Sequence, residues 1–426
     1  MQVKRVGTAL SVTTLLAIGI ATLTPTSGGA TSGSFWCIAC GDLGALDVAA
    51  NIVLFIPLGF ALVLAIGRRG RAVAACIITT LLIELLQYRL VRGRDAALSD
   101  VLSNSLGGWL GAELALRWRM LLHPRRSEAP WLALTATTLL AGVLSLTSVA
   151  LTPASVPRAL WVQWLPERPG FARFTGRLLA FDVDGIDLPL GFPNPKLQVD
   201  AHLRAPTWSA TATISPMGLR PARSIIVRVA EEFTVLVSVE QTGNDLTCQQ
   251  KTRASDYGFR SPKVALRGGL QSAEADDDGA SSGEPVQLTC ARHERALVAA
   301  VTRGGHRSEY SLRLSPSLGW LVLSPFDVAF DDRYRIMSVA WLAVLAFPSG
   351  YWAGWARQRR DGSSRVGRLG AWGTQAAVVM ALTIGFLIVP LVAHTAVAAW
   401  WEWGAAAGAV LAGAVSARLA ARWWAD

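Results

Sequence analysis

The chain has 426 residues, of which 52% are hydrophobic and only 16% charged, and its mean hydropathy is +0.37. Soluble domains carry about a quarter charged residues, so the composition excludes a purely soluble protein. The net charge of +10 does not indicate nucleic-acid binding, because the basic residues form short clusters between apolar runs. Such clusters are typical of the loops of a membrane protein.

Eight apolar segments are long enough to cross about 30 Å of hydrocarbon at 1.5 Å per residue. The third and fourth are short and carry polar groups. The first also fits a secretory signal, but we expect an uncleaved helix. The predicted spans are residues 6–23, 48–66, 72–88, 101–117, 131–151, 335–355, 371–393 and 396–417.

Basic residues precede the first predicted span and follow the second, fourth, sixth and eighth. Cytoplasmic loops retain positive charge, so both termini are predicted to be cytoplasmic and residues 152–332 extracytoplasmic. One short loop breaks the pattern, because Arg89, Arg92 and Arg94 then lie on the outer side.

Residues 152–332 have a soluble composition and separate two membrane regions, at 1–151 and 333–426. Their short β-branched or alternating runs, divided by Gly, Pro, Asn and Asp, predict an all-β sandwich. The fold class is therefore a polytopic α-helical membrane protein of about eight spans with an extracytoplasmic all-β sandwich. Predicted strands are 196–205, 208–214, 224–229, 233–240, 285–290 and 296–301.

The cysteines agree with an oxidising compartment. Cys248 and Cys290 lie in predicted strands, and Cys37 and Cys40 lie in the first outer loop, so each pair is expected to form a disulfide. A metal or redox site at Cys37 and Cys40 ranks lower, since no second cysteine pair or histidine is near. Cys76 is expected to be an inert residue of the third span.

No metal or other cofactor is expected. The acidic stretch 274–284 does not match the spacing of an EF-hand, and a solvated turn explains it better.

Polar residues interrupt the predicted spans with helical spacing. Glu84 and Gln87 are three residues apart, and Asp100 and Asn104 are four apart. A charged side chain at mid-helix costs roughly 2.5–3.5 kcal/mol on insertion scales. The Asp-Val-x-x-Asn pattern of Asp100 also occurs at residues 47–51, which indicates an internal repeat of two helical hairpins.

A purely structural explanation exists for part of this set. Asp47 and Asp100 fit helix N-caps, and Gly107 and Gly111 fit a close-packing face. The amides fit interhelical hydrogen bonds. The combination of Glu84, Arg94 and Asp100 instead predicts a paired or ligand-facing cluster near the outer leaflet. The predicted ligand-binding residues are Asn51, Glu84, Gln87, Arg94, Asp100 and Asn104.

The order of motifs resembles the VanZ-like family over about residues 6–118. The motifs are Asn51, Phe-x-Pro-Leu-Gly at 55–59, Glu-x-x-Gln at 84–87, Gly-Arg at 93–94 and Ser-Asp-x-x-x-Asn-x-x-Gly at 99–107. The family is known for its link to glycopeptide (teicoplanin) resistance, so the resemblance implies a role at the cell envelope. Separately, residues 233–252 and 312–326 resemble strands of a laminin-G/concanavalin-like jelly roll.

The leading hypothesis is a non-enzymatic protein whose partners are membrane lipid and a cell-wall glycan or glycolipid. Trp161, Trp164, Trp208 and Trp320 are candidate glycan platforms, and each also fits a core position. One alternative is a membrane enzyme acting on a lipid-linked headgroup, with Glu84 or Asp100 as acid or base and Arg94 as a phosphate clamp. The other alternative is a small-solute carrier, which the internal repeat favours.

Overall fold

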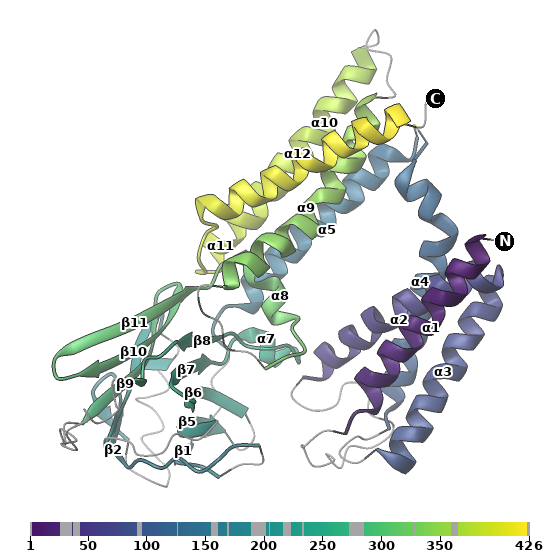
Figure 1. Cartoon of the computed structure of the whole chain (residues 1–426). Coiled ribbons are helices and arrows are strands. Elements are labelled where there is room, and N and C mark those ends of the chain that lie inside the picture. Colours follow the sequence, from purple (N-terminus) through teal and green to yellow (C-terminus); the bar gives the residue numbers. More distant parts are fainter. Residues whose placement is uncertain are drawn as a thin grey trace. The chain divides into compact units, whose positions relative to one another are not determined.

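The computed structural model describes two compact units, which we treat separately (Figure 1). The N-terminal unit comprises Met1–Arg125 with the short segments Tyr257–Arg260 and Leu323–Pro325, and the second unit comprises the rest. The described residues are 2–25, 36, 43–91, 96–125, 127–154, 161–167, 170–188, 202–203, 205–215, 223–231, 234–271, 285–327, 329, 331, 333–358 and 365–423.

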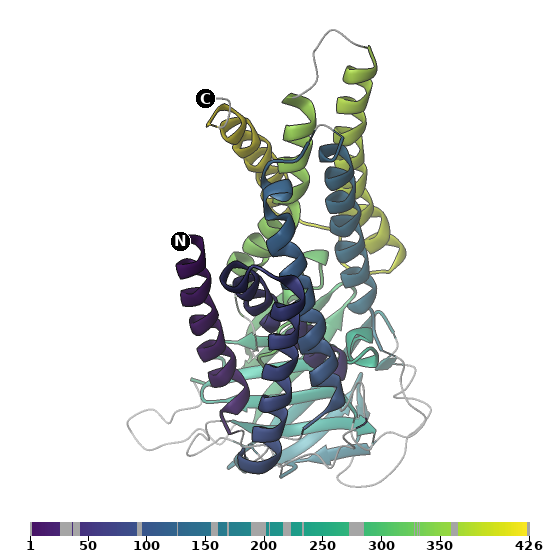
Figure 2. The same cartoon turned by 90° about the vertical axis from the view of Figure 1, so that its right-hand side faces the viewer.

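Four helices form the N-terminal unit. In it α2 packs against α1 and α4, and α3 packs against α4 (Figure 2, purple to blue). Their apolar composition explains both the helices and their exposed outer faces, since lipid replaces water around such segments. The helices are α1 Gln2–Leu23, α2 Gly44–Ile66, α3 Arg69–Leu90 and α4 Leu98–Leu122.

Glycines bring α2 and α4 into backbone contact. A Cβ at Gly107 would collide with the carbonyl of Ile52, and a Cβ at Gly111 would collide with the carbonyl of Ile56. A Cβ at Gly59 would collide with the backbone of α4. Small residues permit this close approach in membranes. The contact of α4 moves from Ile52 to Ile56 on α2 as it moves from Gly107 to Gly111 on α4. The two helices therefore run parallel.

The second unit contains the remaining long helices. Its α9 and α12 also pack through glycines, since a Cβ at Gly350 or Gly413 would collide with the backbone of the other helix. Leu140, Leu144 and Phe386 lie in the apolar core that α5 shares with these helices. The helices are α5 Ala129–Ala150, α9 Tyr334–Gln358, α10 Arg365–Thr383, the π-helix Ile384–Ile388, α11 Val389–Val392 and α12 Trp400–Trp423.

Seven helices within the described ranges are long and apolar enough to cross a membrane, so the protein is a multi-pass membrane protein. They are Gln2–Leu23, Gly44–Ile66, Arg69–Leu90, Ala129–Ala150, Tyr334–Arg357, Gly373–Val392 and Trp400–Trp423. The other predicted span corresponds to α4. It is a helix of 25 residues, but polar residues such as Asp100, Asn104 and Glu113 make it less apolar, and its crossing of the membrane stays a prediction.

A β-sandwich interrupts the helices of the second unit, as predicted. Its five-stranded sheet has the order β1-β5-β6-β7-β8, and its six-stranded sheet has the order β11-β10-β9-β4-β2-β3. Side chains alternate between the faces of β4, so that Trp208, Ala210, Ala212 and Ile214 enter the core. The strands are β1 Trp161–Trp164, β2 Leu178–Val183, β3 Ile186–Asp187, β4 Thr207–Ile214, β5 Ser224–Glu231, β6 Thr234–Thr242, β7 Asp245–Gln250, β8 Lys263–Leu266, β9 Val286–His293, β10 Ala296–Arg303 and β11 His306–Arg313.

Two strand predictions differ from the structure. Of the predicted strand 196–205, His202 and Leu203 are helical, and residues 196–201 and 204 lie outside the described residues. The strand expected over 312–326 ends at Arg313 in β11. It gives way to a 3₁₀ turn at Pro316–Leu318 and to α8, Gly319–Val322. Proline starts such turns because its φ is preset and it has no N–H to donate. This part of the jelly-roll resemblance is wrong.

Candidate functional site

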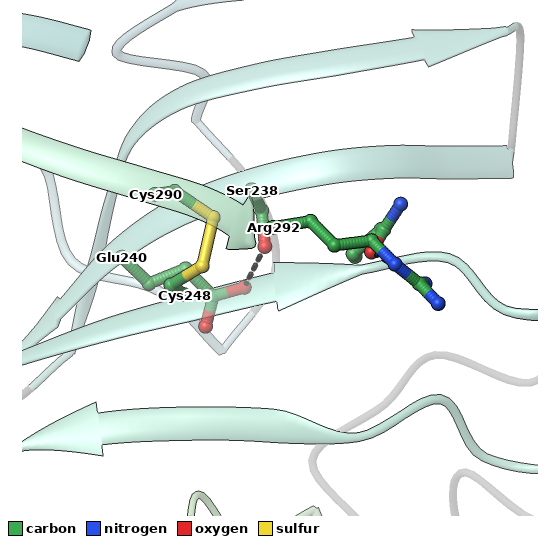
Figure 3. The surroundings of a disulfide bond; sticks show 6 residues. Ser238, Glu240, Cys248, Cys290 and Arg292 are labelled. Carbon is green, nitrogen blue, oxygen red and sulfur yellow. Dashed lines mark hydrogen bonds between the residues drawn. A yellow bond between two sulfur atoms is a disulfide. The ribbon is translucent and has the colours of Figure 1, made fainter. Parts of the chain in front are cut away.

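The predicted disulfide between Cys248 and Cys290 joins the two sheets of the sandwich through β7 and β9 (Figure 3). The Cα atoms of the two residues are 5.5 Å apart, well within the range that a disulfide spans. A crosslink of this loop length stabilises a fold by about 2–4 kcal/mol. Cys37 and Cys40 lie outside the described residues, and Cys76 is a buried free thiol on α3.

Arg292 lies two positions beyond Cys290 on β9, and its side chain is 1% exposed (Figure 3). Its Nη1 donates to Oε1 of Gln250 at 3.2 Å, and its Nε donates to the carbonyl of Glu294 at 3.1 Å. Burial lowers the pKa of Arg292 to about 10. The guanidinium therefore stays protonated at neutral pH. Its two hydrogen bonds join the end of β9 to the end of β7.

Of the four tryptophans considered as glycan platforms, none of the three whose side chains are described is exposed. Trp208 is 1% exposed and belongs to the sandwich core. Trp320 is half-buried, and its Nε1 donates to Oγ of Ser338 at 3.0 Å. Trp164 is half-buried on β1, and the side chain of Trp161 lies outside the described part. The interpretation of Trp208 as a core residue is therefore correct.

The described members of the predicted membrane cluster lie on α2, α3 and α4 of the N-terminal unit. Glu84 and Gln87 are each 5% exposed on α3, and Asn104 is 2% exposed on α4. Thr80, also fully buried, precedes Glu84 by one helical turn on the same face. Buried polar side chains thus line the face of α3 that contacts α1 through Gln87 and α4 through Thr80.

Glu84 caps the first turn of α4. Its Oε2 accepts a hydrogen bond from the backbone N–H of Ala97 at 3.0 Å. A carboxylate is favoured at this position, because the N–H groups of the first helical turn have no partner within the helix. The carboxyl group of Asp100 is close enough to Glu84 to interact with it electrostatically.

Two amides join the helices. Gln87 Nε2 donates to the backbone carbonyl of Thr22 on α1 at 3.0 Å, and Asn104 Nδ2 donates to Oγ1 of Thr80 at 2.9 Å. Their carbonyl oxygens, Gln87 Oε1 and Asn104 Oδ1, are buried and accept no hydrogen bond from the described residues. A buried acceptor left without a donor costs about 1–3 kcal/mol, so each oxygen is a candidate ligand contact.

Asp47 and Asn51 on α2 lie at about the same level along the bundle as Asp100 and Asn104 on α4. Residues of α4 contact residues of α2 that come 55 positions earlier in the chain, as Gly107 does with Ile52, and the two Asp-Val-x-x-Asn patterns are 53 positions apart. The parallel packing of α2 and α4 therefore aligns the two copies of the predicted repeat. Asn51 and Asp100 are half-buried, and Ser99 Oγ donates to Asp100 Oδ1 at 3.3 Å.

Arg94 lies outside the described residues, so its expected pairing with Glu84 or Asp100 stays a prediction. Thr80 and Thr22 were not predicted as partners. Thr80 shares the spacing of Glu84 and Gln87, and this stripe contains the only signal that could have found it. Thr22 contributes a backbone carbonyl, for which the sequence contains no signal. Within the described ranges, no group of three His, Cys, Asp or Glu residues could hold a metal ion.

The N-terminal unit is a helical bundle with a buried polar cluster. In the second unit, apolar helices precede and follow a disulfide-linked sandwich. These features define a multi-pass membrane protein with a candidate intramembrane binding site. Residues 10–121 match the family described as VanZ/LLP1. The matched segment covers about a quarter of the chain and nearly all of α1 to α4. No curated protein and no solved structure matches the chain.

Proposed function

We propose that the protein is a VanZ-like envelope protein that binds the polar headgroup of cell-wall or glycolipid material without chemical conversion. The observation that supports this proposal is the pair of buried amide oxygens, on Gln87 and Asn104, that have no donor in the described part of the chain. Polar groups inside membrane helices are expensive and commonly mark binding sites or pathways. Both oxygens lie in the part of the chain that resembles the VanZ/LLP1 family.

The depth of the cluster fits a headgroup. Glu84 lies six residues before the end of α3, and Asn104 lies six residues after the start of α4. At 1.5 Å per residue each lies about 9 Å from its helix end. A ligand here would place its polar part near the boundary of the hydrocarbon and its acyl chains alongside the helices.

The expected orientation of the chain favours an outward-facing cluster. The disulfide between Cys248 and Cys290 supports an oxidising compartment for the sandwich, and the clusters of Lys and Arg favour cytoplasmic termini. The cluster then lies at the outer leaflet, and the sandwich extends toward the cell wall. A cell-wall glycan is therefore a second candidate ligand for the sandwich.

A small-solute carrier is the alternative that an observation favours, because the parallel α2 and α4 align two copies of a hairpin repeat, as in transport folds. The enzyme alternative is less well supported. Glu84 already accepts the N–H of Ala97, so one of its two oxygens is engaged in capping rather than available to a substrate.

Glycopeptide susceptibility tests the proposed function. We expect a teicoplanin-susceptible host that expresses the protein to become less susceptible, and we expect Asn104→Leu to abolish this effect. The matched control is Ser105→Ala on the same helix, whose hydroxyl donates to the carbonyl of Val101 at 2.6 Å. Equal susceptibility with and without the wild-type protein would contradict the proposal, as would an Asn104→Leu variant as effective as wild type.

A further inference from the structure

Two short segments from the second half of the chain belong to the N-terminal unit. They are Tyr257–Arg260, which lies between β7 and β8, and Leu323–Pro325, which follows α8. The first segment contacts α2 directly, because the backbone N–H of Leu46 donates to the carbonyl of Gly258 at 3.0 Å. Leu46 lies in the first turn of α2, where N–H groups have no partner within the helix. The carbonyl of Gly258 therefore supplies an acceptor that the helix itself lacks.

This contact is a close approach of two backbones. Gly258 has a φ of +73°, in the left-handed region that favours glycine. A Cβ there would also lie 2.9 Å from the backbone nitrogen of Ala45. The attachment of the segment to α2 thus depends on Gly258 and not on the neighbouring side chain of Tyr257.

Arg260 attaches the second segment to the first. Its Nε donates to the carbonyl of Ser324 at 3.0 Å, and its Nη2 donates to the carbonyl of Pro325 at 3.2 Å. The rigid fork of a guanidinium suits such a two-point contact. The two segments therefore lie side by side.

Each segment exposes an apolar side chain. Tyr257 is 61% exposed and Leu323 is 40% exposed. The residue of α2 that bonds to Gly258, Leu46, lies two residues before the predicted span 48–66. At 1.5 Å per residue this is about 3 Å along the helix. The segments are thus attached near the level where hydrocarbon gives way to headgroups.

A second tyrosine lies at the same end of the bundle. Tyr88 on α3 is 73% exposed, and it follows the glutamine that donates to the carbonyl of Thr22 in the last turn of α1. Gly7, near the other end of α1, packs against Leu64 near the end of α2, so Thr22 lies at the level of the start of α2. Tyrosine has an apolar ring with a polar tip and is enriched at membrane interfaces. Tyr88 and Tyr257 fit such an interfacial belt.

We propose that Tyr257–Arg260 and Leu323–Pro325 form an interfacial anchor, which places the side chains of Tyr257 and Leu323 in the headgroup boundary of the bilayer. The partner is the lipid surface, because the segments are attached at the end of a helix long and apolar enough to cross the membrane. Lipid buries apolar side chains that water would leave hydrated. The anchor holds the connection between β7 and β8 at the bilayer. The inference does not depend on the ligand of the proposed function.

The accessibility of spin labels in proteoliposomes tests the anchor. The full-length protein, with Cys37 and Cys40 replaced by serine, carries a nitroxide at Tyr257→Cys or at Leu323→Cys. The vesicles contain phosphatidylethanolamine and phosphatidylglycerol. Collisions of the label with oxygen, which concentrates in hydrocarbon, are compared with collisions with a nickel chelate that stays in water.

Two further labelled positions provide the references. Val53→Cys, at a position of α2 that is 65% exposed, is the reference for lipid. Ser308→Cys, at an exposed position of β11, is the reference for water. We expect the ratio of oxygen to nickel collisions at Tyr257→Cys and Leu323→Cys to lie between the two references and closer to Val53→Cys.

Two results would overturn the anchor. One is a ratio at Tyr257→Cys or Leu323→Cys equal to that at Ser308→Cys, because the labelled side chain would then lie in water. The other is a low collision rate with both reagents, because protein rather than lipid would then cover the segments. Replacing these side chains by cysteine leaves the attachment intact, since the bonds of Gly258 and Arg260 do not involve them.

Arg260→Gln tests how the second segment is held. It removes the two-point contact with Ser324 and Pro325, so the ratio at Leu323→Cys should fall toward that of the water reference. The ratio at Tyr257→Cys should remain, because Gly258 still contacts α2. An unchanged ratio at Leu323→Cys would overturn the inference that Arg260 holds Leu323 at the bilayer.

Discussion

The side-chain amide of Asn104 on α4 donates a hydrogen bond to the hydroxyl of Thr80 on α3 at 2.9 Å, and both side chains are buried. This bond crosses the interface of a helical hairpin in an apolar environment. Interhelical hydrogen bonds in membranes contribute modestly, about 0.6 kcal/mol on average. Removing one partner costs more, because the other is then buried without any bond.

Thr80→Val should therefore lower the stability of the N-terminal unit by about 1–2 kcal/mol, measured as a lower melting temperature in detergent. The matched control is Thr79→Val. The hydroxyl of Thr79 donates to the carbonyl of Ala75 in its own helix at 2.8 Å, and we expect its loss to have little effect. Equal melting temperatures for the two variants would show that the interhelical bond contributes nothing.

The parallel contact of α2 and α4 predicts a steric effect. Gly59→Ala should destabilise the N-terminal unit by about 1–3 kcal/mol, the typical cost of overpacking, because its Cβ would meet the backbone of Gly108. Gly19→Ala on α1 is the control, since a Cβ there meets nothing within 4 Å. Expression yield and thermal unfolding measure both. If Gly59→Ala behaves like Gly19→Ala, the helices are not packed as described.

Acid should weaken the ion pairs that join Asp327, in the segment before α9, to Lys263 and Arg223. Burial alone would raise the pKa of Asp327, but Lys263 and Arg223 outweigh it and lower that pKa to about 2. Lys263 Nζ lies 2.9 Å from one carboxylate oxygen and Arg223 Nη2 lies 2.6 Å from the other. Because the folded pKa is below the ordinary 3.8, the stabilisation is complete above about pH 4 and is lost as the pH falls through about 2.

Asp327→Asn should accordingly lower the melting temperature at pH 7 and reduce its loss between about pH 4 and pH 2. Glu309→Gln is the control, because its pair with Arg307 is exposed on β11 and such pairs contribute little. Thermal melts over this range measure the effect. An acid transition of the same size in wild type and Asp327→Asn would rule out this role for Asp327.

The sequence predicts the helices well, because an apolar run of about twenty residues has few other structures available in a membrane. It is less informative for α4, where Asp100 and Asn104 lower the hydropathy of a helix that the structure nevertheless contains. Edge strands such as β11 were not predicted, since most of its side chains are exposed and polar. Their assignment depends on pairing with distant strands, and local patterns do not encode that pairing.

The candidate site shows the same limit. The spacing of Glu84, Gln87 and Asn104 identifies polar residues on helix faces, but their partners come from a backbone carbonyl of α1, a backbone N–H before α4 and a threonine. Threonines in helices commonly bond to their own backbone, so the helical spacing of Thr80 from Glu84 does not by itself identify it as a partner of Asn104. Which oxygens remain open is a property of the packed bundle alone.

Topology can be measured in intact cells, in a background with Cys37 and Cys40 replaced by serine. We expect Ser308→Cys, on an exposed position of β11, to react with a membrane-impermeant thiol reagent from outside. Gly70→Cys, at the exposed start of α3, should react only after permeabilisation, because the adjoining arginines favour the cytoplasm. The reverse pattern would contradict the orientation and, with it, the outer-leaflet site.

The most direct test of the central claim compares stability with function in Thr80→Val and Asn104→Leu. Both variants lose the hydrogen bond between Asn104 Nδ2 and Thr80 Oγ1, so both should melt at a lower temperature in detergent, but only Asn104→Leu removes the buried oxygen of Asn104 that no described donor satisfies. The effect on teicoplanin susceptibility should disappear in Asn104→Leu and persist in Thr80→Val. Loss of the effect in both variants, or its retention in Asn104→Leu, would show that Asn104 serves the fold, and would contradict the account.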